Sequence, residues 1–145
     1  MSPSPSPNIF ISYSREDVRI VEYVVRMLEL AGATVWVDIH QLKYGQRWRD
    51  EVHQAIVKSD RVIIFWGKSA ALSEEVLTEI QIATELGKLV VPISIDGEEL
   101  PSNLKEFHGI ADLRSAFSEL HSYISSGAPL GLLGRRVLGT LFSAA

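Results

Sequence analysis

Glu79 is the residue in this sequence that is best placed to do chemistry. It lies in the first turns of a predicted helix at residues 73–87, SEEVLTEIQIATELG, which follows the apolar run RVIIFW at residues 61–66. A carboxylate beside a bound ligand can stabilise developing positive charge or hold hydroxyl groups. Most glutamates on helices are solvated surface residues, so the elements around Glu79 decide which role it has.

The helix pattern puts Glu79 at the edge of the face that packs on the core. Val76, Ile80 and Ala83 recur at the spacing of one helix face, and Glu79 lies about 100° from Ile80 around the axis. Such a position removes part of the water that would otherwise surround the carboxylate. Glu75, one turn earlier, would bring a second carboxylate to the same place if both side chains point into one crevice.

Strand-like apolar runs alternate with helical patterns along the rest of the chain. We predict strands at residues 8–12, 34–37, 61–66, 89–95 and 109–113, with helices between them and a last helix at 115–124. Strands that are apolar on both faces indicate an α/β domain, with a parallel sheet covered on both sides by helices. Right-handed crossovers favour the five-strand order 2-1-3-4-5. Pro92 is discordant with the fourth strand, because proline has no N–H to give to a sheet.

Two polar segments follow the first and third strands, where this strand order places a ligand crevice. They are Ser12-Tyr13-Ser14-Arg15 and Trp66-Gly67-Lys68-Ser69. Each segment also has a structural interpretation. Ser14 fits the N-cap of the next helix, Arg15 fits a solvated first-turn residue, and Trp66 fits a core residue at the end of an apolar strand.

Length and composition limit the other functions open to the chain. Its 145 residues suit one domain, and the absence of cysteine excludes disulfides, thiolate metal sites and a cysteine nucleophile. This composition fits a reducing compartment, so we expect a cytoplasmic protein. A net charge of −4 with no lysine or arginine cluster argues against a nucleic-acid partner. The histidines lack metal-ligand spacing and glycine-rich nucleotide motifs are absent, so no metal site is predicted.

The two ends of the chain differ from the domain between them. Residues 1–7, MSPSPSP, form a Ser/Pro repeat that we expect to be disordered, and residues 8–126 form the domain. Residues 127–145 are apolar but glycine-rich, and Arg135 and Arg136 interrupt them, which argues against a membrane span. Such a tail needs a surface to pack against, and we favour its own domain or a neighbouring protomer over a membrane interface.

Three stretches of the sequence match one known pattern in their order and their gaps. Residues 8–32, NIFISYSREDVRIVEYVVRMLELAG, match its first box; residues 37–65, VDIHQLKYGQRWRDEVHQAIVKSDRVIIF, match its BB loop and the following helix and strand. Residues 73–79, SEEVLTE, stand where the pattern has Ser-x-Trp-Cys-x-x-Glu, with Glu75 and Val76 in place of Trp and Cys. From Asn8 to about Ile124, the chain therefore resembles a Toll/interleukin-1 receptor (TIR) domain.

The resemblance implies a flavodoxin-like fold and one of two functions. Prokaryotic-type members cleave the nicotinamide–ribose bond of NAD⁺ with the motif glutamate, here Glu79, and many act in immune or antiphage defence. Other members are non-catalytic adaptors that signal through homotypic TIR–TIR contacts. We expect the enzyme, with NAD⁺ as substrate and no cofactor. The residues expected to bind substrate, from the crevice segments and the matched motifs, are Ser12, Tyr13, Ser14, Arg15, Asp38, Gly45, Trp48, Trp66, Ser69, Ser73 and Glu75.

Cleavage of NAD⁺ suits a site with a single carboxylate. The leaving group is a pyridinium that departs as neutral nicotinamide, so no second carboxyl group is needed to protonate it, unlike in an ordinary glycosidase. The products are ADP-ribose or a cyclic isomer. The resemblance also implies a split site, in which the BB loop of one protomer, residues 38–47 here, completes the crevice of the next. Head-to-tail contacts that do not close grow into filaments.

Overall fold

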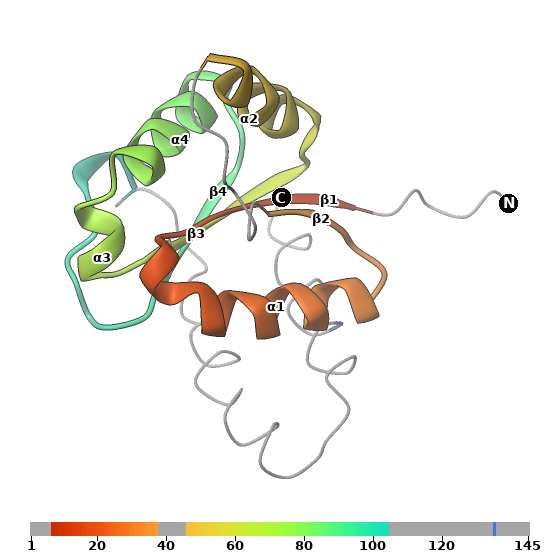
Figure 1. Ribbon diagram of the computed structural model, residues 1–145, viewed down its shortest axis with the longest axis horizontal. Helices are drawn as coiled ribbons and strands as arrows, with labels where there is room; N and C mark the ends of the chain where they lie inside the picture. Colours follow the sequence, from red (N-terminus) through yellow and green to blue (C-terminus); the bar gives the residue numbers. More distant parts are fainter. Residues whose placement is uncertain (1–6, 38–45, 105–134, 136–145) are drawn as a thin grey trace, which may run out of the picture.

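The core of the protein is a parallel sheet in the order β2-β1-β3-β4. The strands are β1 (Asn8–Ser12), β2 (Thr34–Trp36), β3 (Arg61–Trp66) and β4 (Val90–Ser94). The computed structural model describes residues 7–37, 46–104 and 135 (Figure 1). The predicted α/β fold class and the order of the first four strands are confirmed. The predicted fifth strand (109–113) and last helix (115–124) lie outside the described residues, as do residues 1–6 and nearly all of the tail.

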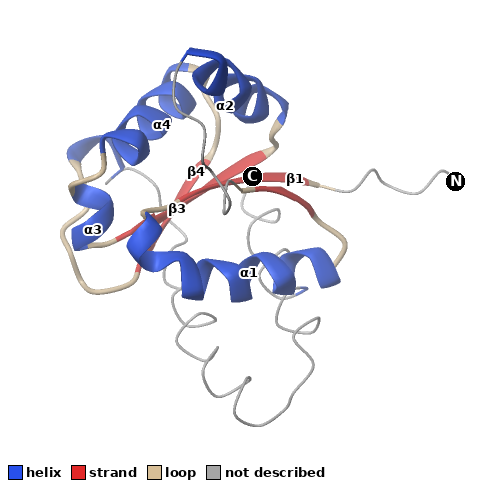
Figure 2. Cartoon of the chain, viewed as in Figure 1, coloured by secondary structure: helices blue, strands red, loops and turns tan. Residues whose placement is uncertain are grey.

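Helices cover both faces of the sheet (Figures 1 and 2). α1 (Val18–Leu30) lies on one face, after a short 3₁₀ turn, η1 (Arg15–Asp17). α2 (Gln46–Lys58), α3 (Lys68–Ala71) and α4 (Glu74–Glu85) lie on the other, and a 3₁₀ turn, η2 (Ser102–Leu104), follows β4. α1 ends at Leu30, two residues before Gly32, which adopts a φ of +103°, a left-handed conformation that suits glycine.

The side chains of β1 alternate between these two faces. Ile9 and Ile11 pack in the cluster on the α1 side, together with Val21, Val24, Val25 and Leu28 of α1. Phe10 packs on the opposite side and stacks on Trp36, with ring centroids 5.0 Å apart. The two-residue period of a strand puts Ser12 on the same side as Phe10, which is the side that α4 covers. This alternation decides which helix Ser12 can reach.

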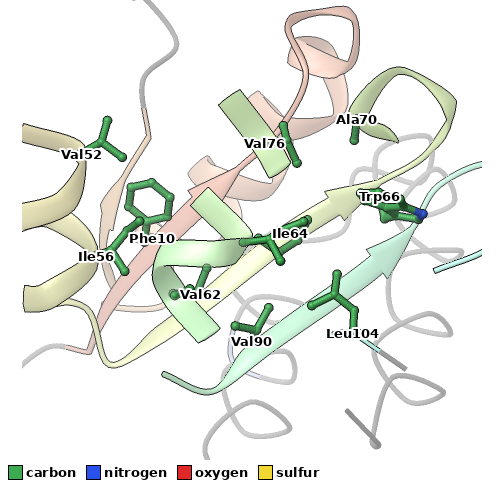
Figure 3. Close-up of a cluster of buried hydrophobic side chains, with 12 residues drawn as sticks. Phe10, Val52, Ile56, Val62, Ile64, Trp66, Ala70, Val76, Val90 and Leu104 are labelled. Atoms are coloured by element: carbon green, nitrogen blue, oxygen red, sulfur yellow. The ribbon is translucent and has the colours of Figure 1, made fainter. Parts of the chain in front are cut away.

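The hydrophobic cluster on the α2 and α4 side of the sheet packs α4, the helix that carries Glu79, against the strands (Figure 3). Val76, Ile80 and Ala83, the predicted core stripe of α4, are all buried there. The other members are Phe10, Val52, Ile56, Val62, Ile64, Trp66, Ala70, Val90 and Leu104. Because three turns of α4 are anchored in this way, Glu79 has a defined position relative to the ends of β1 and β3.

Pro92 is accommodated inside β4, although its presence there is unusual for a strand. The backbone N–H of Ile95 donates to the Trp66 carbonyl (2.9 Å), and the Leu89 carbonyl accepts from Val62 (3.0 Å). The odd-numbered residues of this strand therefore direct their backbone groups at β3, and Pro92 directs its nitrogen the other way. In the described sheet β4 pairs only with β3, so the missing N–H costs no bond between them.

The sequence analysis missed α3, which interrupts the connection between β3 and α4. Gly67 precedes it, and a Cβ at this position would lie 2.8 Å from Ile95 Cγ1 and 2.9 Å from Asp96 Oδ2. Only a residue without a side chain lets the segment after β3 approach the segment after β4 so closely. This close approach joins two loops at the carboxyl-terminal edge of the sheet.

Candidate functional site

Glu79 meets Ser12 at the carboxyl-terminal end of β1. The Ser12 hydroxyl donates a hydrogen bond of 2.5 Å to Oε1 of Glu79. Ser12 is 1% exposed and Glu79 is 8% exposed, so the carboxylate is more deeply buried than the boundary position predicts. A length of 2.5 Å falls in the range of charge-assisted bonds between a hydroxyl and a carboxylate. The fold thus joins two predicted site residues that are 67 positions apart in the sequence.

A side-chain cap defines the start of α4, the helix that carries Glu79. Ser73 is the N-cap residue, and its Oγ accepts a hydrogen bond from the Val76 backbone N–H at 3.2 Å. The same hydroxyl donates to Oε2 of Glu75 at 3.3 Å, and the Glu75 side chain is exposed. Capping therefore accounts for Ser73, and the exposed Glu75 contacts the capping hydroxyl. The predicted roles of both residues in substrate binding stay predictions.

The side chains of residues 12–15, at the end of β1 and after it, have different surroundings. Tyr13 is half-buried and packs on the α1 side, opposite to Ser12, as strand alternation requires. Ser14 is buried and precedes η1 with an extended backbone, but its side chain makes no capping hydrogen bond; its carbonyl accepts from Asp17 N–H at 2.8 Å. Arg15 is exposed in η1. In this segment the Ser12 side chain is hydrogen-bonded to Glu79.

Trp66 is a core residue in this structure. It is 3% exposed, lies at the end of β3 near Ala70 (Figure 3), and its indole N–H donates to the Glu99 carbonyl at 2.8 Å. A ring so enclosed has little surface to offer a ligand, which favours the core role over the substrate-binding role. Ser69, from the same predicted segment, is half-buried within α3.

The side chains of three predicted site residues lie outside the described part of the structure. Asp38 and Gly45 lie outside the described residues, and Trp48 lies in α2 at a position where only the backbone is described. Their predicted roles in substrate binding remain predictions. The BB loop, residues 38–47, contains two of the three.

Asp96 lies just after β4, at the carboxyl-terminal edge of the sheet, and the sequence analysis did not single it out. It follows β4, and its Oδ2 accepts from the Lys68 backbone N–H (2.9 Å) while its Oδ1 accepts from the Glu98 N–H (3.0 Å). These two backbone donors lower the pKa of Asp96 from its ordinary value. The available signal was a carboxylate just after a predicted strand, at the edge where parallel strands place their ligands.

Asp17 is a half-buried carboxyl group that lies within electrostatic range of Asp96. Its Oδ2 is buried and has no hydrogen-bond partner among the described residues. Desolvation raises the pKa of Asp17, and the negative charges of Asp96 and then Glu16 raise it further. Since a raised pKa means that the folded state holds this proton more tightly than the unfolded state, stability falls as pH rises above about 3.8, the unfolded value.

We therefore expect Asp17→Asn to stabilise the protein at neutral pH. The amide removes the charge that the fold disfavours, so the melting temperature should rise at pH 7 and change little at pH 3, where the native carboxyl is protonated. Thermal unfolding at the two pH values measures the difference. Glu16→Gln, which removes a neighbouring exposed charge, is the matched control and should give a smaller rise. An Asp17→Asn variant that is less stable at pH 7 would contradict this account.

The described part of the chain shows neither a metal cluster nor a membrane helix. No group of three or more His, Asp or Glu side chains within residues 7–37 and 46–104 could hold a metal ion. Among the helices that the structure describes, none has the length and apolar character to cross a membrane.

Comparisons with known proteins agree with the fold. The chain is similar in structure to the TIR domain of the Toll-related receptor TRR-2 from Hydra magnipapillata, with a TM-score of 0.63 and 23% identity over 81% of this chain and 95% of that one. It is also similar to the TIR domains of the activated Roq1 resistosome, with a TM-score of 0.57 and 23% identity over 97% of this chain and 86% of that one. At 23% identity, these structural similarities show a shared fold and no more.

Sequence comparison gives the family. No curated protein matches the chain closely enough to serve as a named relative. The sequence profile described as "TIR domain", however, matches residues 9–122, which is most of the chain and includes Ser12, Ser73 and Glu79. The chain therefore belongs to the TIR domain family.

Proposed function

We propose that this TIR domain cleaves the bond between nicotinamide and ribose in NAD⁺, with Glu79 as the catalytic residue. The observation that carries the proposal is the buried carboxylate of Glu79, held by Ser12 at the end of β1. In the order β2-β1-β3-β4, the chain passes from β1 to β2 on one side and from β3 to β4 on the other, so the switch point lies between β1 and β3. α/β folds bind ligands at the carboxyl-terminal edge of the sheet beside such a point. A carboxylate with little water around it exerts a stronger field on a bound ligand than a solvated one.

The chemistry needs little beyond one fixed negative charge. The bond between ribose C1′ and the pyridinium nitrogen breaks, and its electron pair stays on nitrogen, so nicotinamide leaves as a neutral molecule. The ribose becomes an oxocarbenium-like cation, which the Glu79 carboxylate stabilises by charge or through the ribose hydroxyls. Water then attacks C1′ and loses a proton, which gives ADP-ribose; attack by an oxygen or nitrogen atom of the same molecule gives a cyclic isomer.

The direct test is nicotinamide release from NAD⁺ by the purified chain. Chromatography resolves nicotinamide, ADP-ribose and cyclic isomers, and so identifies the product as well as the activity. Protein should be assayed over a wide concentration range, because the site is expected to be completed by a neighbouring protomer. Absence of turnover across that range would rule out the proposed activity for this chain.

Self-assembly is the expected means of activation. In the proposed arrangement the BB loop of one protomer completes the site of the next, and such head-to-tail contacts extend into filaments. The Roq1 relative belongs to an activated resistosome, which is itself an assembly. Assembly of this chain is therefore a matter for experiment.

Specific activity should therefore rise with protein concentration. If two protomers form one site, the rate per protomer depends on the fraction of protomers that are paired. At concentrations where most protomers are dissociated, mass action should raise this rate about tenfold for each tenfold increase in protein concentration. Light scattering on the same samples reports assembly. Gly45→Pro, in the BB loop, should lower the activity while leaving a folded monomer. A constant specific activity from monomers would contradict activation by assembly.

A non-catalytic adaptor is the second candidate, favoured by apolar side chains on the surface of α3 and α4. Leu72, which follows α3, is 86% exposed, and Leu77 on α4 is 43% exposed. The two leucines are five positions apart in the sequence, and exposed apolar side chains that form a patch are typical of contact surfaces. An adaptor would assemble through such contacts without consuming NAD⁺, so assembly without turnover would favour this function over the enzyme.

A further inference from the structure

A hydrogen bond links Ser12, at the end of β1, to Glu79 on α4. As the last residue of β1 it shares a face with Phe10, and this face lies under α4. Its hydroxyl donates to Oε1 of Glu79 across 2.5 Å, and the two residues are 1% and 8% exposed. A hydroxyl at this position can reach the carboxylate, but with 1% exposure it has almost no surface of its own for a ligand.

This bond has consequences for the geometry of the carboxylate. A buried carboxylate requires hydrogen-bond donors, because it has given up water. A glutamate also has three rotatable side-chain bonds, and a short charge-assisted hydrogen bond restricts them. Ser12 ends the central strand β1 and is in register with Ile64 of β3, so the backbone that carries the donor is held by the sheet. Glu79 is thereby held against a rigid part of the fold.

We infer that Ser12 is a positioning residue that aligns the Glu79 carboxylate for NAD⁺ cleavage, rather than a residue that binds the substrate. This inference rests on the proposed function. An interaction that only aligns a catalytic charge acts on the transition state, where positive charge develops, and has little effect on binding of the ground state. Loss of the Ser12 hydroxyl therefore lowers kcat and leaves KM nearly unchanged. A substrate-binding serine would instead raise KM.

The kinetic test compares two buried serines. Ser12→Ala should lower kcat roughly ten- to hundredfold, the scale expected when a catalytic group loses its alignment. Ser59→Ala is the matched control: Ser59 is 4% exposed and its hydroxyl donates to the Ile56 carbonyl at 2.7 Å, at the other end of the sheet. The control should keep the wild-type kcat per folded molecule. Ser12→Thr, which retains a hydroxyl, should recover much of the activity.

A second measurement works without turnover. Urea unfolding of Ser12→Ala, Glu79→Leu and the double variant forms a double-mutant cycle. Each single variant removes one partner of a buried hydrogen bond, whereas the double variant removes both, so the double should be destabilised by less than the sum of the singles. Additive effects would show that the two side chains are not coupled, and would overturn the inference.

The outcomes separate this inference from the proposed function. Wild-type turnover with an unchanged kcat in Ser12→Ala, or with a raised KM alone, overturns the positioning role and leaves the enzyme intact. Absence of turnover in the wild type overturns the enzyme and the positioning role together, while a coupled unfolding cycle would still assign the Ser12–Glu79 bond to stability. A drop in kcat with rescue by Ser12→Thr supports both.

Discussion

Glu79→Gln should abolish NAD⁺ cleavage while leaving the fold intact. The amide has nearly the same shape as the carboxylate, and its oxygen can still accept the hydrogen bond that Ser12 gives to Oε1. It carries no charge, so the oxocarbenium-like ribose loses its main electrostatic partner. Removal of one such stabilising group typically costs about a hundred- to a thousandfold in rate. We therefore expect kcat to fall by at least roughly a hundredfold in a nicotinamide-release assay.

The control for this prediction is the same substitution elsewhere on α4. Glu85 is exposed near the end of the helix and accepts a hydrogen bond from Gln81 Nε2 at 3.1 Å. Glu85→Gln should keep the wild-type rate. The wild type, Glu79→Gln and Glu85→Gln should have similar melting temperatures. Glu79→Asp adds a further distinction, because it keeps the charge but withdraws it from the ribose. Wild-type activity in Glu79→Gln would remove Glu79 from the mechanism.

Trp66→Leu should destabilise the protein strongly and leave its kinetics per folded molecule unchanged. The indole is 3% exposed and packs in the cluster that holds α4. Its N–H donates to the Glu99 carbonyl, so the substitution both creates a cavity and leaves that carbonyl without its donor. A loss of about 3 kcal/mol in the free energy of unfolding is expected from buried aromatic truncations. Urea unfolding measures this loss.

Trp66→Phe distinguishes packing from hydrogen bonding. Phenylalanine keeps much of the buried aromatic volume but cannot donate to the Glu99 carbonyl, so its loss should be clearly smaller than that of Trp66→Leu. The contrary result is a raised KM with little change in melting temperature for both variants. It would return Trp66 to substrate binding, as a substitute for the aromatic residue that the family motif has at the position of Glu75.

Several elements of this fold could be predicted because local signals agreed with the tertiary structure. Short apolar runs predicted β1 and β3, helical periodicity predicted α1 and the core stripe of α4, and the structure confirms them. α3 could not be predicted, because a four-residue helix has too few residues for a periodic pattern. Its position depends on the contact between Gly67 and Asp96, which lie 29 positions apart and meet only in the folded chain.

The fold class, the order of the first four strands and the candidate Glu79 could all be predicted along the chain. These depend on patterns within short segments, on the handedness of strand connections and on a motif, all of which can be read along the chain. The folded structure was needed to show that Ser12 is hydrogen-bonded to Glu79, that Trp66 packs in the core, and that the half-buried Asp17 is affected by the charge of Asp96. The physical reason is that burial, electrostatic coupling and hydrogen bonding depend on distances between segments far apart in sequence, and the packing of helices on the sheet sets those distances.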